Sequence, residues 1–405
     1  MKPKTFMLIA GEASGDVLAA ELVRALRQEF AETEAIPTQD YQPLHASLEP
    51  RFFGAGSPRM AAEGVDLALD MTAHAVIGLT EVLKHYLKFR RLFHQLFELA
   101  LQRQPDAIVC VDFSGFNRRF AHAVRQYARA QTGWFHDWNP RIIQYVSPQV
   151  WASREGRVFQ MARDYDLVLS IFPFEHAWYA KRVPQLPIEY VGHPIVDRYA
   201  DRPRAREDGR RTQNTSNLLL LPGSRASELA RHLPVMLAAF ELIRAKTPDL
   251  RARMVLPNAN LLKQAKALGL PAGLEAQIGG LPEALAVTDV AIASTGTVTT
   301  ECAYFGVPTV ALYKISWSTW QIAKRIVKVK YAAMPNLLAN EEVFPEFIQS
   351  AATSDNITRA TVDLLRDAPR RAKVKARLAE IIASLGDPGA PRRAAKAIIS
   401  KLKDG

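Results

Sequence analysis

The feature of the sequence that most constrains its fold is a series of short apolar runs, each followed by a turn and a helical pattern. The clearest runs are Thr5–Ala10, Ala107–Val111, Leu167–Ser170, 217–221, 290–293 and 308–312. Several of them end in a turn that carries Gly or Ser, which is typical of βα units around a parallel sheet. Because polar residues do not alternate within the runs, we expect strands buried on both faces. The pattern predicts an α/β protein.

A polar segment near the middle divides this series. Residues 201–217 (DRPRAREDGRRTQNTSN) show no apolar periodicity and are rich in charges, so we interpret them as an exposed linker. The strand pattern restarts directly afterwards, and 405 residues are enough for two to three domains. We therefore predict an N-terminal domain of residues 1–200 and a C-terminal domain of residues 218–405, facing each other across a cleft. Residues 32–51 are interpreted as a surface insertion.

Composition excludes several classes of protein. A hydrophobic content of 48% argues against disorder, and two cysteines argue against a disulfide scaffold and suit a reducing cytoplasm. No run reaches the roughly 18 apolar residues of a spanning helix. The N-terminus lacks the apolar core of a secretory signal. The formal net charge of +11 indicates an acidic partner, for which nucleic acid, anionic lipid and a phosphorylated substrate all qualify.

The first notable turn, residues 11–16 (GEASGD), follows the first predicted strand. Gly11 and Gly15 permit a tight turn and a close approach of the backbone to a ligand. Glu12 and Asp16 would repel a diphosphate, so a turn that orients sugar hydroxyls or a catalytic group fits better. The alternative is an ordinary tight βα turn.

A second turn opens the C-terminal half. Gly223 lets the backbone approach a ligand, Ser224 can cap the following helix, and Arg225 offers a forked donor suited to phosphate. The alternative is a simple capped helix start with a solvated arginine.

A third turn, residues 294–301 (STGTVTTE), again lies between a strand and a helix. Ser294, Gly296 and Thr297 suit a phosphate cradle at a helix N-terminus. Glu301 lies one turn further on, where its carboxylate could bind two ribose hydroxyls. Alternatively, this is a threonine-rich first turn with Glu301 complementing the helix dipole. Two such cradles in one half favour a nucleotide diphosphate site there.

Two further residues suggest chemistry. Asp112 directly follows a buried strand, where a carboxylate is a reasonable general base, although it is equally suited to capping the next turn. His193 precedes the linker and could reach the cleft, but a hinge or packed histidine is the favoured alternative. The nine histidines are scattered and no G-x-S-x-G, H-E-x-x-H or C-x-x-C motif occurs, so we expect no protein-bound metal.

Two stretches combine basic and apolar residues. Residues 79–100 carry an apolar stripe at helical spacing, with a net charge of +3 between Glu81 and His94. An interfacial amphipathic helix fits, but such a stripe is more often core. Residues 313–330 contain five Lys/Arg, no acid, and the two tryptophans Trp317 and Trp320. Lipid headgroups, a phosphorylated ligand or single-stranded nucleic acid all suit that stretch, and nucleic acid is the weakest of the three.

Taken in chain order, these segments resemble the bacterial lipid-A-disaccharide synthase family. The resemblance covers residues 4–339 and continues more loosely through the C-terminal helices. It rests on residues 11–16, 77–83 (IGLTEVL), 112–117, 146–151 (VSPQVW), 221–225 (LPGSR), 294–301, 313–314 and 335–338. The resemblance implies a GT-B fold, in which two Rossmann-like domains face across a cleft, with the last helices returning to the N-terminal domain.

The resemblance also implies a reaction. It is the transfer from UDP-2,3-diacylglucosamine to 2,3-diacylglucosamine 1-phosphate, with inversion and without a metal or other cofactor. Asp112 would be the base and Glu12 a second catalytic residue. The substrate-binding residues implied are Ser14, His193, Gly223, Ser224, Arg225, Ser294, Gly296, Thr297, Glu301, Tyr313 and Asn336.

The resemblance further implies a cytoplasmic enzyme, peripheral to the anionic inner-membrane surface, with a homodimer left open. Two alternatives remain. A UDP-sugar 2-epimerase of the same fold would need neither basic apolar stretch, and a basic nucleic-acid-binding module is supported only by charge.

Overall fold

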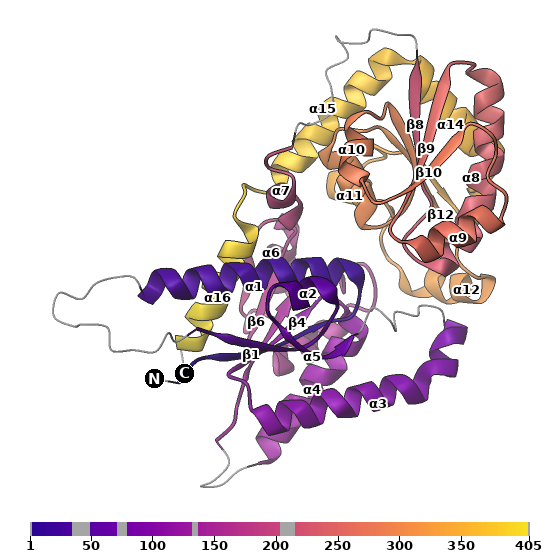
Figure 1. The fold of residues 1–405 in the computed structure, drawn as a ribbon. Coiled ribbons are helices and arrows are strands. Elements are labelled where there is room, and N and C mark those ends of the chain that lie inside the picture. Colours follow the sequence, from indigo (N-terminus) through magenta and orange to yellow (C-terminus); the bar gives the residue numbers. More distant parts are fainter. Residues whose placement is uncertain (1, 35–48, 71–78, 132–136, 203–214, 404–405) are drawn as a thin grey trace. The chain divides into compact units, whose positions relative to one another are not determined.

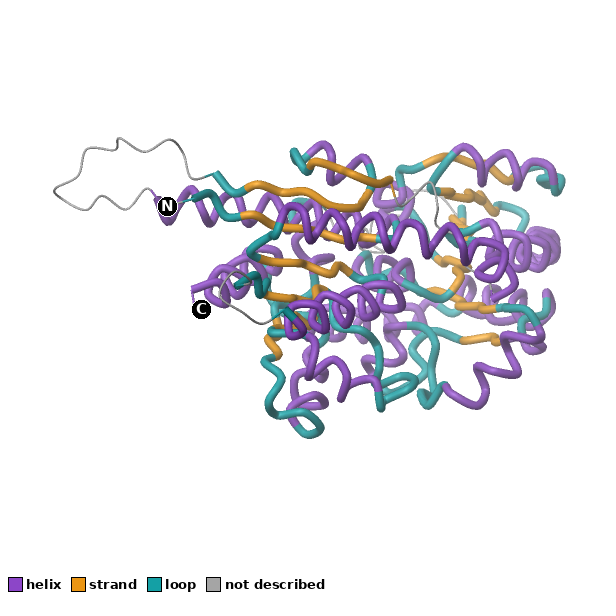
Figure 2. The backbone as a smooth tube through the Cα atoms, turned by 90° about the horizontal axis from the view of Figure 1, so that it is seen from below, coloured by secondary structure: helices purple, strands orange, loops and turns teal. Residues whose placement is uncertain are grey.

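The computed structural model describes residues 2–34, 49–70, 79–131, 137–202 and 215–403. The chain divides into two compact units. The first unit combines Met1–Asp197 with Leu385–Gly405, and the second is Arg198–Ser384. Each unit is a parallel sheet with helices, and Figure 2 traces the alternation of strands and helices that produces them. The predicted α/β class is therefore confirmed.

The sheet of the first unit has seven parallel strands in the order β3-β2-β1-β4-β5-β6-β7. Its strands are β1 (Thr5–Ala10), β2 (Arg51–Gly56), β3 (Asp66–Asp70), β4 (Ala107–Val111), β5 (Arg141–Tyr145), β6 (Leu167–Ser170) and β7 (Ile188–Tyr190). Its helices are α1 (Ala13–Glu34), α2 (Pro58–Ala62), α3 (Leu79–Arg103), α4 (Ser114–Ala130), α5 (Arg157–Asp164), α6 (Pro173–Ala180), α7 (Pro194–Arg198, which ends at the unit boundary) and α16 (Ala390–Lys403). Strands β1, β4 and β6 have the bounds that the sequence predicts.

The apolar runs form the core because helices cover the sheet. In β1, Met7 and Ile9 are fully buried and belong to one cluster with Phe120 and Val124 of α4. Their neighbours Phe6 and Leu8 are equally buried, as expected for a strand covered on both faces.

The C-terminal helix α16 belongs to the first unit, where it lies along α1 (Figure 1). Arg392 forms ion pairs with Glu29 and Glu32 of α1. Arg393 donates from Nε to the Val191 carbonyl oxygen at 2.7 Å. Residues 385–405, predicted as the end of a C-terminal domain whose last helices return to the N-terminal one, belong to the first unit, and the boundary falls at Asp197 rather than after residue 200.

The sheet of the second unit has six parallel strands in the order β10-β9-β8-β11-β12-β13. Its strands are β8 (Ser216–Leu221), β9 (Leu250–Leu256), β10 (Leu274–Ile278), β11 (Val290–Ser294), β12 (Thr309–Tyr313) and β13 (Glu346–Ile348). Its helices are α8 (Ala226–Lys246), α9 (Ala259–Ala267), α10 (Leu281–Ala286), α11 (Thr297–Tyr304), α12 (Trp317–Ile326), α13 (Met334–Ala339), the 3-10 turn Gln349–Ala351, α14 (Ser354–Arg366) and α15 (Ala368–Ser384). The three strands predicted here are present, each within one residue of its expected bounds.

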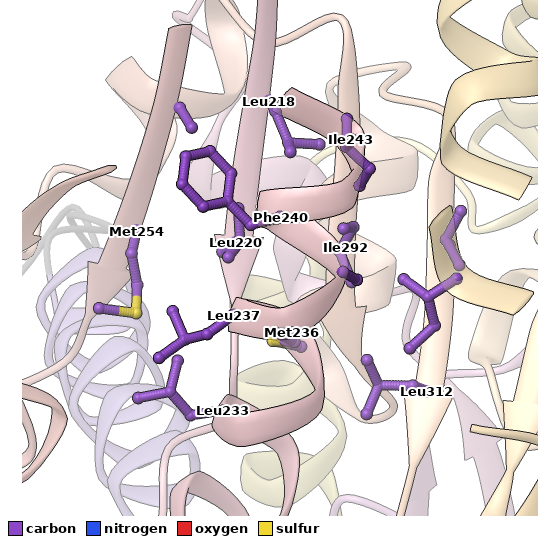
Figure 3. Close-up of a cluster of buried hydrophobic side chains, with 14 of the residues drawn as sticks. Leu218, Leu220, Leu233, Met236, Leu237, Phe240, Ile243, Met254, Ile292 and Leu312 are labelled. Carbon is purple, nitrogen blue, oxygen red and sulfur yellow. The ribbon is translucent and has the colours of Figure 1, made fainter. Parts of the chain in front are cut away.

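The core of the second unit forms between β8 and α8 (Figure 3). Leu218 and Leu220 of the strand meet Leu233, Met236 and Phe240 of the helix, all at most 2% exposed. The 3.6-residue period of α8 and the two-residue period of β8 bring these side chains to a common layer.

Three predicted segments lie wholly or partly outside the described residues. Residues 35–48 of the insertion and 203–214 of the linker are among them, as are the side chains of residues 79–88. The helix predicted for residues 79–100 is present as α3. From Leu92 onward its apolar stripe packs inside the unit, with Phe93 and Phe97 centred 5.7 and 6.4 Å from the Phe120 ring. Among the helices described, none is long and apolar enough to cross a membrane.

Candidate active site

The carboxyl edge of the first sheet brings Glu12, Ser14 and Asp112 together. Strands β1 and β4 are hydrogen-bonded neighbours whose last residues, Ala10 and Val111, are in register. The two turns that follow therefore leave the sheet side by side. The Ser14 hydroxyl donates to Oδ2 of Asp112 at 3.5 Å, and all three side chains are half-buried. The sequence placed them in separate turns, and the parallel register joins them.

The glycines of the first turn make this approach possible. A Cβ on Gly11 would lie 2.2 Å from Cδ1 of Phe113, far inside van der Waals contact. A Cβ on Gly15 would lie 3.5 Å from Cβ of Asp112. Gly11 is therefore required for the turn after β1 to pack against the turn that carries the candidate base.

The backbone under Asp112 is strained and firmly held. Asp112 and Phe113 have φ values of 49° and 41°, in the left-handed region that non-glycine residues rarely occupy. The Asp112 amide donates to the Tyr145 carbonyl at 2.7 Å. The Asp112 carbonyl accepts from Nδ2 of Asn117 at 3.0 Å and from Nε2 of Gln144 at 3.3 Å. Such strain at a strand end persists only where neighbours fix it.

Gln144 is the residue of this edge that the sequence analysis missed. It is fully buried in β5, and Asn117 is fully buried in α4. A polar amide directly after Ile142 and Ile143 in the strand RIIQY was the available signal, because buried amides need partners. Together the two amides fix the direction in which the Asp112 carboxylate leaves the sheet.

Asp16 has a structural role that the charge argument did not foresee. It is 1% exposed, and its carboxylate accepts from the backbone amides of Ser57 at 2.8 Å and Arg59 at 3.2 Å. The Asp16 carboxylate therefore stabilises the backbone amides at the start of α2.

His193 lies between β7 and α7 at the end of the first unit. Its Nδ1 accepts from the Ile195 amide at 3.1 Å, and its ring centre is 5.5 Å from that of Phe172. Because Nδ1 is the acceptor, the neutral ring carries its proton on Nε2. These contacts are those of a packed, capping histidine, and its binding of substrate stays a prediction.

The carboxyl edge of the second sheet brings together the turns proposed for the nucleotide. Strands β8, β11 and β12 are neighbours, with Leu221 in register with Ala293 and Ser294 in register with Leu312. The turns after these strands therefore share one edge. It is the place where parallel sheets bind ligands.

The sequence analysis overlooked Glu228, an acid in the first turn of α8 that contacts the turn after β8. Gly223 has a φ of 122°, and a Cβ there would lie 2.6 Å from Oε2 of Glu228. That oxygen accepts from the Ser224 amide at 3.0 Å, while Oε1 pairs with Nη1 of Arg225 at 3.2 Å. The expectation that the Ser224 side chain caps α8 is corrected: Arg225 is the N-cap residue, without a side-chain cap bond.

The turn after β11 presents a helix N-terminus. Ser294 ends the strand and is buried, Gly296 is the N-cap with a φ of 137°, and Thr297 begins α11. Glu301 accepts at Oε1 from the Tyr199 hydroxyl at 2.6 Å. Burial raises the pKa of the Glu301 carboxyl, and the Tyr199 hydrogen bond opposes that shift.

His232 ties the first and third of these turns together. It is fully buried; Nδ1 donates to the Pro222 carbonyl at 3.0 Å, and Nε2 accepts from the Lys314 amide at 3.0 Å. Its ring lies 5.9 Å from that of Tyr313, and burial lowers its pKa. A neutral His232 thus fixes Arg225 and Tyr313 on one rigid edge.

Asn336 lies inside the second unit, where its amide is hydrogen-bonded to neighbouring residues. It is fully buried; Oδ1 accepts from the amides of Val343 at 2.9 Å and Phe344 at 2.7 Å. Its Nδ2 donates to the Phe344 carbonyl and to Oε1 of Glu346, both at 2.7 Å. Since all four hydrogen-bonding positions of the amide are used, the assignment of Asn336 to substrate binding is corrected to a structural role.

No group of three or more His, Cys, Asp or Glu side chains in the described ranges is arranged to hold a metal ion. Metal independence itself stays a prediction.

The sequence is similar to those of known proteins over nearly its whole length. A model of the family described as Lipid-A-disaccharide synthetase matches residues 6–398. A relative from Trichlorobacter lovleyi, named lipid-A-disaccharide synthase, is 34% identical over 409 residues, covering 99% of this chain and 98% of its own.

Solved structures resemble the chain in fold. A putative UDP-N-acetylglucosamine 2-epimerase from Listeria monocytogenes has a TM-score of 0.58 at 13% identity, covering 100% of this chain and 98% of its own. The calicheamicin glycosyltransferase CalG4 has a TM-score of 0.57 at 16% identity, with 100% and 99% covered. These likenesses confirm the predicted GT-B fold class.

Proposed function

The chain belongs to the lipid-A-disaccharide synthetase family, and we propose that it joins UDP-2,3-diacylglucosamine to 2,3-diacylglucosamine 1-phosphate. The products are UDP and a β-1′,6-linked disaccharide 1-phosphate. Family membership makes the chain a glycosyltransferase of lipid A biosynthesis. The observation that carries the finer proposal is the fixed Asp112 carboxylate at the edge of the first sheet, beside Ser14.

In the proposed reaction Asp112 is the general base. It accepts the proton of the acceptor 6-hydroxyl as that oxygen bonds to the anomeric carbon of the donor. The bond from the anomeric carbon to UDP breaks on the opposite side, so the configuration inverts. Ser14 orients the carboxylate by its hydrogen bond, and Glu12, on the neighbouring turn, accepts from an acceptor hydroxyl.

The second sheet edge holds UDP in this proposal. The N-termini of α8 and α11 and the Arg225 guanidinium would donate to the diphosphate, with the Ser224 amide and Arg225 exchanging their contacts with Glu228 for the ligand. Glu301 accepts from the ribose hydroxyls, and Tyr313 lines the same edge through its link to His232. Because these groups stabilise the leaving diphosphate, we propose that no metal ion is required, and activity should survive a chelator such as EDTA.

One experiment tests the whole proposal. Purified protein is incubated with both acylated sugars, and the products are followed by mass spectrometry. Formation of the disaccharide together with UDP is expected only when both substrates are present. Conversion of the UDP-sugar without an acceptor would instead identify an epimerase, and no turnover at all would refute the proposal.

We also propose that the protein docks on the anionic cytoplasmic face of the inner membrane through α12. No residue of this helix is buried. Trp317 is 76% exposed, Ile322 is 43% exposed, and Lys324 and Arg325 lie on the same short helix. Exposed aromatic and aliphatic side chains next to cations suit the headgroup region of an anionic bilayer.

Flotation with phosphatidylglycerol vesicles tests this contact. Trp317→Ser and Lys324→Glu should each weaken vesicle binding while leaving UDP affinity unchanged. A matched surface substitution, Arg359→Glu on α14, should have a smaller effect. Equal flotation of all variants, or a gel shift of nucleic acid at physiological salt, would contradict docking through α12.

A further inference from the structure

Four arginines gather in the first unit where α4 and α5 begin, outside the residues assigned above. Arg118 and Arg119 lie near the start of α4, Arg157 is the first residue of α5, and Arg154 precedes it in the loop. Arg118 crosses to α5, where its Nη1 donates to Oε1 of Gln160 at 2.5 Å. The charges of Arg118, Arg154 and Arg119 act on Arg157 and, together with burial, lower its pKa. The four guanidinium groups therefore share one region of the surface.

Among the described residues, no carboxylate lies within ion-pair distance of these arginines. None of the four arginines forms an ion pair with a carboxylate in the part of the chain that the structure describes. The acid nearest in sequence, Glu155, has an oxygen 3.9 Å from Nη2 of Arg182. Four unneutralised cations at close range repel one another, so their placement costs the fold free energy.

Helix polarity adds to that cost. The first turns of α4 and α5 contain no acid, although the helix dipole favours acids there and disfavours cations. The N-cap of α5 is Gly156, which makes no side-chain cap bond. A bound anion would offset the repulsion of the arginines and would be favoured by the positive end of each helix dipole.

The backbone leaves room at this place. A Cβ added to Gly115 on α4 or to Gly156 would meet no atom within 4 Å. Neither glycine has a positive φ, so neither is required by its conformation or by packing. Bare backbone beside a basic cluster suits the close approach of a ligand.

We infer that Arg118, Arg154 and Arg157, with Arg119 beside them, bind a phosphate monoester, namely the 1-phosphate of the acceptor sugar. The inference rests on the proposed function. It follows from the position of the cluster: α4 starts two residues after Asp112, and Arg118 lies about 6 Å further along the helix axis, the scale of one sugar ring. In this proposal, an acceptor with its 6-hydroxyl at Asp112 would place its 1-phosphate at these arginines.

Acceptor kinetics test the inference. Arg154→Gln and Arg157→Gln should each raise the acceptor KM roughly tenfold, because each removes a charge-assisted hydrogen bond to phosphate. The donor KM should not change. Arg129→Gln, on the last turn of α4, is the matched control and should leave both KM values unchanged.

A second acceptor, which lacks the 1-phosphate, separates a loss of phosphate recognition from a loss of folded enzyme. Wild-type enzyme should prefer the acceptor over the same diacylglucosamine without its 1-phosphate, and the Arg154→Gln/Arg157→Gln variant should lose that preference. Arg157→Lys should restore part of it, since the charge remains. Circular dichroism confirms that each variant is folded, and Arg154, whose side chain is exposed, gives a variant with little risk of misfolding.

Two outcomes would overturn the inference. One is an unchanged acceptor KM and an unchanged preference in the variants. The other is weaker flotation of the variants with phosphatidylglycerol vesicles at an unchanged acceptor KM, which would assign the cluster to lipid headgroups. If wild-type protein forms no disaccharide, the proposed function fails; calorimetric binding of the phosphorylated and unphosphorylated sugars then still decides the phosphate site.

Discussion

The carboxyl edges of the two sheets are built by different means. In the first unit, two consecutive left-handed residues and two buried amides fix one carboxylate, that of Asp112. In the second unit, turns with glycine at φ values of 122° and 137° expose helix starts, and a buried histidine ties two of the turns together. The first edge is arranged to hold a single reacting atom, and the second to present many donors.

This difference teaches how one parallel architecture serves two tasks. A base must be held at a defined angle to the hydroxyl it deprotonates, so its backbone is strained and buttressed. A diphosphate is bound by several amides and a cation, so bare turns at helix N-termini suffice. Substitutions at the first edge should therefore affect turnover, and those at the second should affect nucleotide affinity.

The largest effect is expected for Asp112→Asn. Removal of the base should lower kcat roughly a hundredfold or more and leave the Kd for UDP unchanged. Steady-state rates and calorimetry measure the two quantities. Asp66→Asn, which changes an exposed carboxylate of the same sheet, is the control. Turnover close to wild type in Asp112→Asn would show that the first edge does not hold the catalytic base.

Asn336→Ala should act on stability rather than on either substrate. The substitution leaves the buried amides of Val343 and Phe344 without their acceptor. We expect the free energy of unfolding to fall by about 2–4 kcal/mol, measured by urea denaturation. A folded variant with normal stability and weakened substrate binding would instead support the predicted role of Asn336 in substrate binding.

Arg225→Ala should weaken UDP binding roughly tenfold, because one charged donor to the diphosphate is lost. The acceptor KM should stay constant, whereas substitution of the arginines at the starts of α4 and α5 should raise it. Arg231→Ala on the same helix, whose side chain donates to the Ser227 carbonyl, is the matched control. Equal affinity of the Arg225 variant in calorimetry would refute the role of this turn.

The smallest effect is expected for Tyr199→Phe, which removes only the hydroxyl that donates to Glu301. Burial raises the pKa of Glu301 and this hydrogen bond lowers it, so its loss should raise that pKa further. The proposed ribose contact needs the ionised carboxylate, which is lost as the pH falls through this pKa. As the pH is lowered from neutrality, UDP affinity should therefore begin to decline at a higher pH in the variant than in wild type.

Tyr304→Phe is the control for this pH profile. Its hydroxyl donates its proton to the Tyr199 carbonyl at 2.9 Å. The control should keep the wild-type profile. Identical profiles in all three proteins would show that Tyr199 does not tune Glu301.

Much of the fold was predictable because it depends on local pattern. The apolar runs Thr5–Ala10 and Ala107–Val111 are strands with those bounds, and the turns after them begin helices. The polar break near residue 201 marks the change of unit to within a few residues. The return of α16 to α1 was expected from the family resemblance alone, since it depends on long-range contacts such as Arg392 with Glu29.

The site was predictable in part. The importance of Gly11 and Gly223 could be predicted, because a turn that needs glycine excludes a side chain by its conformation or by a close contact. The partners of Gln144 and His232 could not be predicted, because the Asp112 carbonyl and the Lys314 amide are distant along the chain. Glu228 was overlooked although its partner, the Ser224 amide, is only four residues away. Asn336 was assigned to substrate because its four internal partners appear only once the chain is folded.

The sequence by itself determined that the chain forms two series of βα units and which turns end the strands, because apolar runs and glycines act locally. Only the tertiary structure decided which turns share an edge and which polar side chains are used internally. It joined Asp112 to Ser14 and gathered four arginines at two helix starts. Register and packing between distant segments decide these placements, and no local pattern encodes them.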